Sequence, residues 1–327
     1  MELRSMNILL VSGFLGAGKT TFIKELIKRT GTNPVILENE YGDNSIDAQE
    51  LQNTSSGKNK LEILEFMEGC VCCTMKDSFV NSVLTVFSSL SPEYLIIEPT
   101  GVGRLSNIIK NIEPLLHDNI TLLKPIVVVT PRSYRQNIAE WEELYKDQII
   151  NADTVVFSKG ENESPDVLSE TESAIRAINP NADIIKDHYS GQDDEWWRSI
   201  LALPAPDTNA IETDTDSRNI SQLTLDNVRL SNLSELITLL EDCLHGELGH
   251  IVRAKGTLTV GNENIRFDLA DRMYSITDSS LDKSQCVFIG ELLDTTKIRS
   301  RMGCLLNPKP VSLTRAYVNR LVESPAS

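Results

Sequence analysis

The sequence lacks an excess of positive charge and any long apolar run. Its 31 Lys and Arg residues stand against 47 Asp and Glu residues, which gives a formal net charge of −16. An acidic surface of this kind repels nucleic acid and anionic membranes, so we expect neither as a partner. No stretch approaches the roughly 20 apolar residues that a membrane span needs. These absences favour a cytoplasmic protein that binds its ligands at a local site.

Histidine is also scarce, and cysteine is unevenly placed. The four histidines are dispersed and form no histidine-rich loop. Three of the six cysteines are scattered through apolar patterns and are expected to be inert core thiols, namely Cys243, Cys286 and Cys304. The other three crowd together at Cys70, Cys72 and Cys73. In a reducing cytoplasm such a cluster indicates metal or redox chemistry rather than a disulfide framework.

Residues 13–20 fit the phosphate-loop pattern G-x-x-x-x-G-K-[ST] at every fixed position. They lie between an apolar run at 7–11, typical of a buried strand, and residues 21–29, whose apolar spacing is helical. Glycines in such a loop let backbone N–H groups turn toward phosphate oxygens, and the helix N-terminus adds positive potential. We expect Lys19 to reach the β- and γ-phosphates and the Thr20 hydroxyl to bind Mg²⁺. The predicted nucleotide-binding residues are Gly13, Gly16, Ala17, Gly18, Lys19, Thr20 and Thr21.

A carboxylate is predicted at the end of another buried strand, in the segment Ile96-Ile97-Glu98-Pro99-Thr100-Gly101. In an open α/β sheet, ligands bind at the edge formed by the carboxyl ends of the strands. Glu98 can hold the Mg²⁺ shell there or orient the attacking water, and Gly101 leaves its backbone N–H able to approach the γ-phosphate. The alternative is an ordinary helix-capping acid. We predict Lys19, Glu98 and Gly101 as catalytic residues.

The segment Phe157-Ser158-Lys159-Gly160-Glu161 follows a further predicted strand. Guanine-specific switches usually carry Asn/Thr-Lys-x-Asp here, where the acid accepts two N–H donors from guanine and the lysine stem packs on the base. Ser158 replaces the first of these residues, and Glu161, which is longer by one methylene, replaces the acid. Ser158, Lys159 and Glu161 are therefore candidate base-binding residues. A plain surface loop is the alternative, and the choice between GTP and ATP stays open.

The cysteine cluster reads Gly69-Cys70-Val71-Cys72-Cys73. Cys70 and Cys73 have C-x-x-C spacing, and thiolates bind Zn²⁺ tightly and softer ions such as Cu(I) as well. Three sulfur ligands leave one coordination position, which an acid of the preceding acidic loop, Glu40 or Asp43, can fill. The alternative is a set of buried or redox-active thiols. Because the cluster lies between the first helix and the Glu98 strand, a metal bound here would be coupled to the nucleotide state.

Strands and helices alternate up to residue 203, which predicts an α/β fold: a phosphate-loop NTPase domain with a mostly parallel sheet covered on both faces. One strand is expected across 122–129, interrupted at Pro125, and a helix across 77–90. Residues 204–218 contain Pro204 and Pro206 and few apolar side chains, and they are interpreted as a linker. The strand-rich pattern after it predicts a smaller α+β domain. The predicted divisions are 1–203, 204–218 and 219–327.

With these motifs in this order, the chain resembles the CobW-type GTPases, relatives of the UreG and HypB metallochaperones. The motifs are residues 13–20, Glu38-Asn39-Glu40-Tyr41-Gly42, Gly69-Cys70-Val71-Cys72-Cys73 and Glu98-Pro99-Thr100-Gly101, with Arg253-Ala254-Lys255-Gly256 and Val287-Phe288-Ile289-Gly290 in the C-terminal half. The resemblance implies a GTPase domain joined to a CobW C-terminal domain. It also implies slow hydrolysis of GTP with Mg²⁺ and the binding of Zn²⁺ or Co²⁺ at the cysteine motif. By motif match, Thr20 and Glu98 take the Mg²⁺ roles, and the other metal roles fall to Cys70, Cys72, Cys73 and Glu40.

The resemblance also implies a partner, because members of this family are thought to deliver metal or to assist metallocofactor enzymes. Our first hypothesis is a metal-responsive GTPase that serves a client metalloenzyme or cofactor-enzyme protein, as a monomer or homodimer. The second is a metal sensor or chaperone that nucleotide only stabilises. The third, kept open by Glu161, is an ATP-using phosphate-loop enzyme. Arg104 lies near Glu98 in the sequence, but no residue can be assigned as an arginine finger, so a partner is expected to supply that group.

Overall fold

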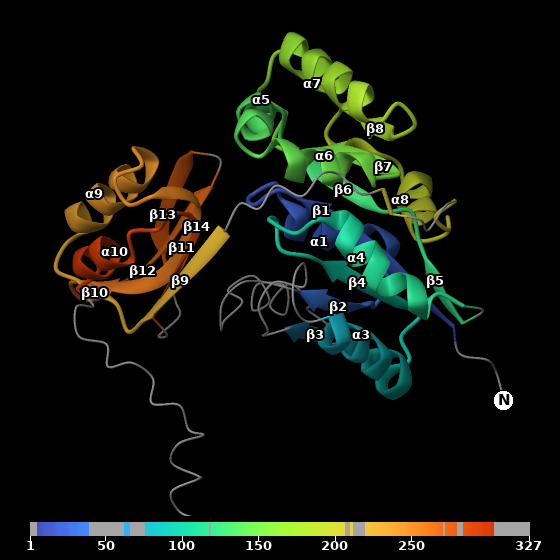
Figure 1. The fold of residues 1–327 in the computed structure, drawn as a ribbon, viewed down its shortest axis with the longest axis horizontal. Helices are drawn as coiled ribbons and strands as arrows, with labels where there is room; N and C mark the ends of the chain where they lie inside the picture. The colour runs from blue at the N-terminus through green and yellow to red at the C-terminus, as the bar shows by residue number, and fades with distance from the viewer. Residues whose placement is uncertain are drawn as a thin grey trace, which may run out of the picture.

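Two β-sheets organise the chain (Figure 1). The structure, a computed structural model, describes residues 5–38, 62–65, 76–117, 119–206, 210–211, 220–270, 272–279 and 284–303. The strands of the first sheet are β1 (Met6–Gly13), β2 (Val35–Glu38), β3 (Glu62–Glu65), β4 (Tyr94–Glu98), β5 (Ile120–Leu122), β6 (Ile126–Val129), β7 (Thr154–Phe157) and β8 (Asp183–Ile185). Their order is β3-β2-β4-β1-β6-β7-β8, and β5 also pairs with β1. Each pair of neighbouring strands described in this sheet is parallel.

The apolar run of β1 explains why this sheet needs helices on both faces. Ile8 and Leu10 belong to one buried cluster, whereas Leu9 and Val11 belong to another. Successive side chains of a strand point to opposite faces of the sheet. A strand that is apolar on both faces is therefore stable only where both faces are covered.

Helices from different parts of the chain cover the two faces. Phe22 of α1 (Lys19–Thr30) and Trp197 of α8 (Asp194–Ile200) pack in the cluster that contains Leu9. The opposite cluster includes side chains of α3 (Lys76–Thr85), α4 (Leu105–Ile112), α5 (Pro131–Glu140), α6 (Glu142–Ile150) and α7 (Pro165–Ile178). The prediction of an α/β fold with a mostly parallel sheet is confirmed.

Two segments of this unit differ from their predicted form. Residues 122–129 do not form one interrupted strand, because β5 pairs with residues 6–8 of β1 and β6 with residues 11–13. Pro125 separates the two strands, since it has no N–H to donate to a ladder, and its carbonyl accepts a hydrogen bond from Asp153 N at 3.0 Å. The helix expected over 77–90 is α-helical only as far as Thr85 and continues as a π-helical turn, Val86–Leu90.

The second sheet is antiparallel apart from one short pair. Its strands are β9 (Ile220–Asp226), β10 (Arg229–Leu230), β11 (His250–Val260), β12 (Glu263–Ala270), β13 (Met273–Asp278) and β14 (Gln285–Glu291). Their order is β13-β12-β11-β14-β9, and β10 pairs in parallel with β11. Helices α9 (Leu233–Leu244) and α10 (Thr295–Arg301) pack on this sheet, which is the predicted α+β unit.

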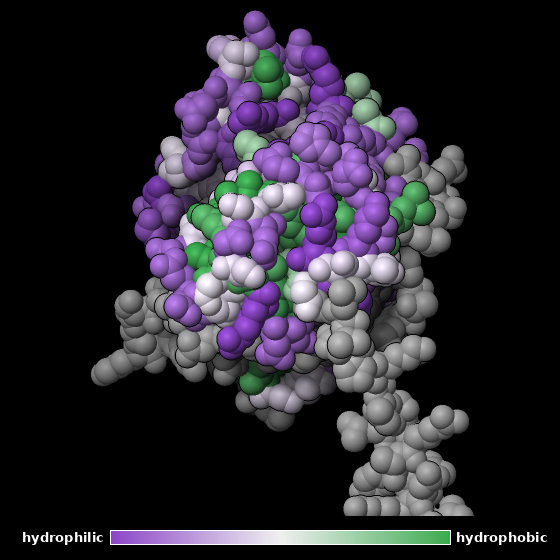
Figure 2. All heavy atoms as spheres, turned by 90° about the vertical axis from the view of Figure 1, so that its left-hand side faces the viewer, coloured by the Kyte–Doolittle hydropathy of each residue, from purple (hydrophilic) through white to green (hydrophobic). Residues whose placement is uncertain are grey.

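Strand β14 shows that both faces of the second sheet are buried. Cys286 and Phe288 belong to the cluster beneath α9 and α10, whereas Val287 and Ile289 belong to a cluster of the first sheet. The second sheet therefore lies between its own helices and the first unit (Figure 1). The surface of this unit that faces away from the first unit carries mostly hydrophilic residues with hydrophobic ones between them (Figure 2). Among the described helices, none has the length and apolar character to cross a membrane.

Candidate nucleotide site

The phosphate loop, residues 13–20, joins β1 to α1 through close backbone contacts. Gly13 has a φ of 141°, and a Cβ there would lie 2.3 Å from Val128 O. Gly18, the N-cap of α1, has a φ of 92°, in the left-handed region that favours glycine. Ala17 N donates to Phe14 O at 3.1 Å and closes a turn that contains Gly16. A glycine loop at a helix N-terminus is a suitable place for an anion.

Lys19 lies across this loop rather than in solvent. Its side chain is 6% exposed, and Nζ donates to Gly13 O at 3.1 Å and to Phe14 O at 3.3 Å. The ammonium group is therefore held at the loop, where the phosphate-loop pattern requires a positive charge. Thr21, also predicted as a nucleotide contact, is exposed in the first turn of α1.

Thr20 and Glu98, the predicted Mg²⁺ ligands, are brought together although 78 positions separate them in the chain. Thr20 Oγ1 donates to Glu98 Oε1 at 2.9 Å and lies 3.1 Å from Oε2. Glu98 ends β4 at the carboxyl edge of the parallel sheet and is 8% exposed. Hydroxyl and carboxylate oxygens are ligands that Mg²⁺ prefers, so this pair of side chains fits that ion.

A second buried carboxylate, which was not predicted as a site residue, lies beside Glu98. Glu38 ends β2, is opposite Glu98 in the β2–β4 register, and is 3% exposed. The signal that could have found it is the one that found Glu98, an acid directly after an apolar strand. The carboxyl edge of the sheet thus carries two buried acids next to the phosphate loop.

Gly101 touches the phosphate loop directly. A Cβ at Gly101 would lie 2.3 Å from Leu15 N and 2.7 Å from Phe14 C, so only glycine allows the two backbone segments to approach this closely. Gln148 of α6 binds the same segment, since its Nε2 donates to Gly103 O at 3.0 Å and to Gly101 O at 3.3 Å. The predicted catalytic glycine therefore lies against the loop and is fixed by a residue that sequence reasoning missed.

Asp147, the neighbour of Gln148 on α6, caps the helix that follows this segment. Its fully buried carboxylate accepts hydrogen bonds from Ser106 N, at 3.1 Å, and from Ser106 Oγ, in the first turn of α4. Burial raises the pKa of Asp147, and the Ser106 bonds and the Arg104 charge act in the opposite direction. Arg104 Nη1 lies 3.9 Å from Asp147 Oδ2. Arg104 is thus paired with the capping carboxylate.

The first two candidate base-binding residues contact the phosphate loop. Ser158 is 2% exposed, and its Oγ donates to Ala17 O at 2.5 Å. Lys159 has a left-handed backbone with a φ of 53°, and its Nζ donates to Gly16 O at 2.8 Å. Both side chains therefore bind loop carbonyls and connect the end of β7 to the loop.

Glu161, the third candidate, pairs with a histidine that follows β8. Its Oε1 lies 2.9 Å from His188 Nε2, and the His188 ring stacks on Tyr189 with the centroids 4.4 Å apart. Burial raises the pKa of Tyr189 to about 12. The acid expected to bind guanine thus has a neighbour that the sequence analysis did not connect with it.

The predicted transition-metal residues Glu40, Cys70, Cys72 and Cys73 lie outside the described residues, as does Asp43. Within the described ranges, no three His, Cys, Asp or Glu side chains gather where they could hold a metal ion. Cys243 and Cys286 are buried and form no disulfide, and burial raises the pKa of Cys243 to about 12. A thiol that stays protonated is inert, which agrees with the role expected of Cys243.

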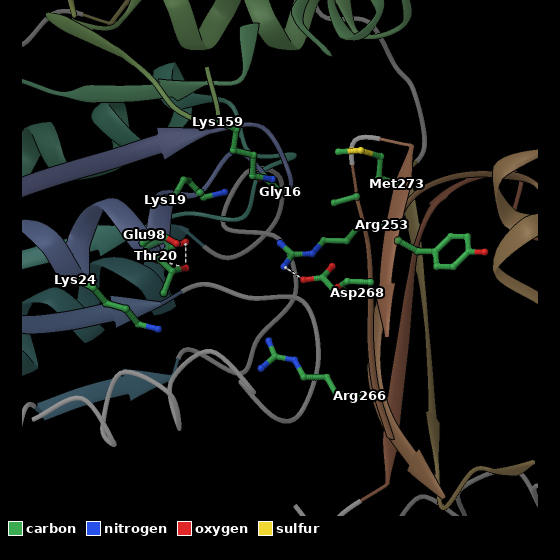
Figure 3. Close-up of a pocket in the computed structure, with 15 residues that line it drawn as sticks. Gly16, Lys19, Thr20, Lys24, Glu98, Lys159, Arg253, Arg266, Asp268 and Met273 are labelled. Atoms are coloured by element: carbon green, nitrogen blue, oxygen red, sulfur yellow. Dashed lines mark hydrogen bonds and ion pairs between the residues drawn. The ribbon is translucent and has the colours of Figure 1, made fainter. Parts of the chain in front are cut away.

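A cavity of about 460 Å³ lies beside the phosphate loop (Figure 3). Lys19, Thr20 and Glu98 line it from the first unit, and Arg253 and Asp268 line it from the second sheet. Sequence reasoning did not bring the C-terminal strands to this site, because a strand pattern does not reveal which face meets another unit. The candidate nucleotide site thus has walls from both units.

A strand, a glycine loop and a helix at the edge of a covered parallel sheet define a P-loop nucleotide-binding domain. The family model described as "CobW/HypB/UreG, nucleotide-binding domain" matches residues 7–186, and the "Cobalamin synthesis protein cobW C-terminal domain" matches residues 220–305. The chain belongs to the CobW/HypB/UreG family, as its motifs predicted.

Individual relatives are more distant. "Zinc chaperone YeiR" of Escherichia coli (strain K12) is 29% identical over 170 residues, which are 51% of this chain and 49% of that protein. "Zinc-regulated GTPase metalloprotein activator 1" of Schizosaccharomyces pombe is 26% identical over 57% of this chain and 47% of that protein. "Zinc chaperone YjiA" of Escherichia coli is 25% identical over 91% of this chain and 98% of that protein. The chain thus spans about half the length of the first of these curated relatives and nearly all of YjiA.

Proposed function

We propose that this chain is a metal-binding GTPase that acts as a metallochaperone or as an assembly factor for a metallocofactor enzyme. The observation that carries the nucleotide part is the Thr20–Glu98 hydrogen bond at the carboxyl edge of the sheet, beside Lys19. A hydroxyl and a carboxylate at this place suit Mg²⁺ and a nucleoside triphosphate. The names of the relatives, two zinc chaperones and a zinc-regulated GTPase metalloprotein activator, support the metal part.

Each proposed catalytic residue acts through its position and charge. Lys19 contacts the β- and γ-phosphates together with the loop N–H groups, and Thr20 and Glu98 hold Mg²⁺. When bound, Mg²⁺ supplies neutralisation of the charge on the phosphate oxygens. Gly101 brings its backbone N–H toward the γ-phosphate. We propose slow intrinsic turnover, because the loop and the β4 edge themselves provide no arginine.

The cysteine motif is the proposed site of the transition metal, which is the cargo. Cys70, Cys72 and Cys73 offer thiolates and Glu40 offers an oxygen, a set of ligands that suits Zn²⁺ or Co²⁺. The names of the relatives favour zinc. The proposed client is a metalloenzyme or a cofactor-enzyme protein in the cytoplasm, served by a monomer or homodimer of this chain.

We also propose that the chain divides into a GTPase domain at 1–203, a linker at 204–218 and a C-terminal domain at 219–327. The described part of the linker binds the first unit: Ala205 N donates to Leu122 O at 2.9 Å. Further along, Ile211 N donates to Asn151 Oδ1 at 2.7 Å. The linker therefore begins as a segment laid along the first unit.

The contacts of the base-binding candidates leave ATP as an alternative to GTP. Ser158 and Lys159 contact the phosphate loop, and Glu161 pairs with His188. These contacts do not select guanine over adenine, so an ATP-using phosphate-loop enzyme is the alternative. The second alternative is a metal-binding module in which the nucleotide only stabilises the protein.

The test is a zinc titration of the protein with no nucleotide, with a non-hydrolysable GTP analogue and with GDP. We expect the analogue to change zinc affinity about tenfold, within the usual range of coupling between sites. Lys19→Ala should abolish this change. The matched control Lys28→Ala, on the same helix with a side chain 75% exposed, should retain it.

Three results of the titration would redirect the proposal. Zinc affinity that is indifferent to nucleotide would favour the binding module. When the titration is repeated with a non-hydrolysable ATP analogue, an effect equal to that of the GTP analogue would contradict a preference for GTP. Zinc binding that persists when Cys70, Cys72 and Cys73 are replaced by Ser, with Cys304→Ser as control, would place the metal elsewhere.

A further inference from the structure

The described lining of the cavity beside the phosphate loop is cationic although the protein is acidic. Its described lining carries two carboxylates, Glu98 and Asp268, and several cations from both units, namely Lys19, Lys24, Lys159, Arg253 and Arg266. The whole chain has a net charge of −16. Cations that converge from both units on one volume of about 460 Å³ create a local field that favours an anion between the units.

Arg253 enters this cavity from the second sheet. It lies on β11, where its neighbour Ala254 is in the core beneath α9 and α10. Since successive strand residues point to opposite faces, Arg253 lies on the face that meets the first unit. Figure 3 shows its guanidinium group extending from the second sheet toward the side of the cavity formed by Lys19 and Thr20.

Asp268 of the neighbouring strand β12 orients Arg253. Arg253 Nη2 donates to Asp268 Oδ2 at 3.3 Å, and the Arg253 side chain is only 12% exposed. An arginine that is already held in place loses less conformational freedom when it binds a phosphate. The pair is therefore suited to present a positive charge to an anion in the cavity.

The geometry points to Arg253 as a residue that contacts the terminal phosphate of the bound nucleotide, with Asp268 as its positioning residue. This inference rests on the proposed function and adds an arginine from the same chain where a partner was expected to supply one. Arginines supplied in this way raise kcat by about 10³–10⁵ in other GTPases, and enzymes with the arginine in the same chain are still slow.

The chemical step does not change the bonds of Arg253. The water oxygen bonds to the γ-phosphorus while the bond from that phosphorus to the bridging oxygen of GDP breaks, which yields GDP, inorganic phosphate and one proton. Arg253 offsets the negative charge on the γ-phosphate oxygens. Because GDP lacks these oxygens, the contribution of Arg253 to binding must be larger for GTP than for GDP.

The experiment measures the binding of a non-hydrolysable GTP analogue and of GDP, and the GTP turnover, for Arg253→Ala, Arg253→Lys and Asp268→Asn. The matched control is Arg229→Ala, which replaces an exposed arginine on β10 of the same sheet. Arg253→Ala should weaken the analogue at least about tenfold and GDP less than about twofold, and should slow turnover at least about a hundredfold. Arg253→Lys should recover part of the analogue affinity, because it retains the charge but not the planar group. Asp268→Asn should show smaller losses of the same pattern.

An analogue-to-GDP affinity ratio that stays at the wild-type value in Arg253→Ala would overturn the inference. Equal weakening of both nucleotides would overturn it too, because that pattern indicates a distorted site rather than a lost γ-phosphate contact. If Arg253→Ala fails to fold, as judged by its thermal midpoint, the analogue-to-GDP affinity ratio of Arg253→Lys decides. A ratio below the wild-type value supports the inference, and an unchanged ratio overturns it. A wild-type protein that does not bind the analogue would refute the proposed function itself.

Discussion

At the scale of single residues, the phosphate loop depends on an approach that leaves no room for a side chain. A Cβ at Gly101 would lie 2.3 Å from Leu15 N and 2.7 Å from Leu15 Cα and Phe14 C. These are backbone atoms, which cannot rotate away as a side chain can. Any side chain at Gly101 must therefore displace the loop that is proposed to bind the phosphates.

We expect Gly101→Ala to weaken binding of the GTP analogue at least about tenfold and to lower the free energy of unfolding by about 1–3 kcal/mol, as overpacking does. Equilibrium binding and urea denaturation measure the two effects. Gly191→Ala is the matched control, since a Cβ there meets no heavy atom within 4 Å. Wild-type affinity in Gly101→Ala would show that this contact does not set the shape of the loop.

The site residues that could be predicted are those that a pattern of neighbouring positions in the sequence identifies. Lys19 and Thr20 follow from a contiguous pattern, and Glu98 from its place after an apolar run. Asp147 and Gln148 could not be found in this way, because their partners Ser106 and Gly101 are 41 and 47 positions away. The only local signal is a polar pair among the apolar positions of a helix. The metal ligands stay predictions, since they lie outside the described residues.

At the scale of elements, α6 supports the segment that joins Glu98 to α4. Asp147 and Gln148 are 0% and 1% exposed, and they bind the start of α4 and the segment after β4. One helix thus holds both the segment after Glu98 and the start of α4. Burial without hydrogen bonds would be costly for both side chains, so the contacts specify how α6 packs.

We expect Gln148→Ala to lower the free energy of unfolding by about 1–3 kcal/mol, because the carbonyls of Gly101 and Gly103 lose a buried amide donor. Urea denaturation gives this value, and the same variant should bind the GTP analogue more weakly than the wild type does. Gln136→Ala is the control: the Nε2 of that half-buried side chain donates to Glu140 Oε1 on its own helix at 2.9 Å, and its loss should cost less than about 0.5 kcal/mol. Equal costs in both variants would contradict a supporting role of α6.

The types of the elements were predictable from apolar periodicity, whereas their divisions were not. Residues 122–129 read as one strand but form two, and residues 220–230 likewise contain two strands, β9 and β10. In both cases the two halves pair with different places: β5 and β6 with opposite ends of β1, and β9 and β10 with β14 and β11. Periodicity reports which side chains are buried and not which strand is the neighbour, so such divisions appear only in the assembled sheet.

At the scale of the whole molecule, Trp141 links the phosphate loop to the second unit. The Phe14 ring lies 6.1 Å from Trp141 and 5.1 Å from Tyr145, measured between ring centroids. Trp141 in turn stacks on His250 of β11 at 5.4 Å. The second sheet thus meets the loop through the Trp141–His250 contact, and its Arg253 lines the cavity beside the loop. A change in the loop is therefore expected to alter the packing of the C-terminal unit, and a change in that packing is expected to alter the loop.

The same interface predicts how the protein unfolds. Domains joined by a small polar interface unfold separately, whereas a large apolar interface couples them. Val287 and Ile289 of β14 are each 4% exposed and belong to the core cluster of the first unit. We therefore expect the full chain to unfold in a single thermal transition when followed by calorimetry and by far-UV circular dichroism.

Ile289→Asn should separate that transition into two. The substitution places an amide among apolar side chains of the first unit and weakens the interface by about 2–4 kcal/mol, while Phe288 and Cys286 still pack beneath α9 and α10. Leu292→Asn, at a side chain that is 90% exposed, should leave the single transition in place. Two transitions in the wild-type protein would mean that the shared core does not couple the units. In that case Arg253 would reach the nucleotide from a unit that moves independently, and its effect on GTP binding would fall as the temperature approaches the first transition.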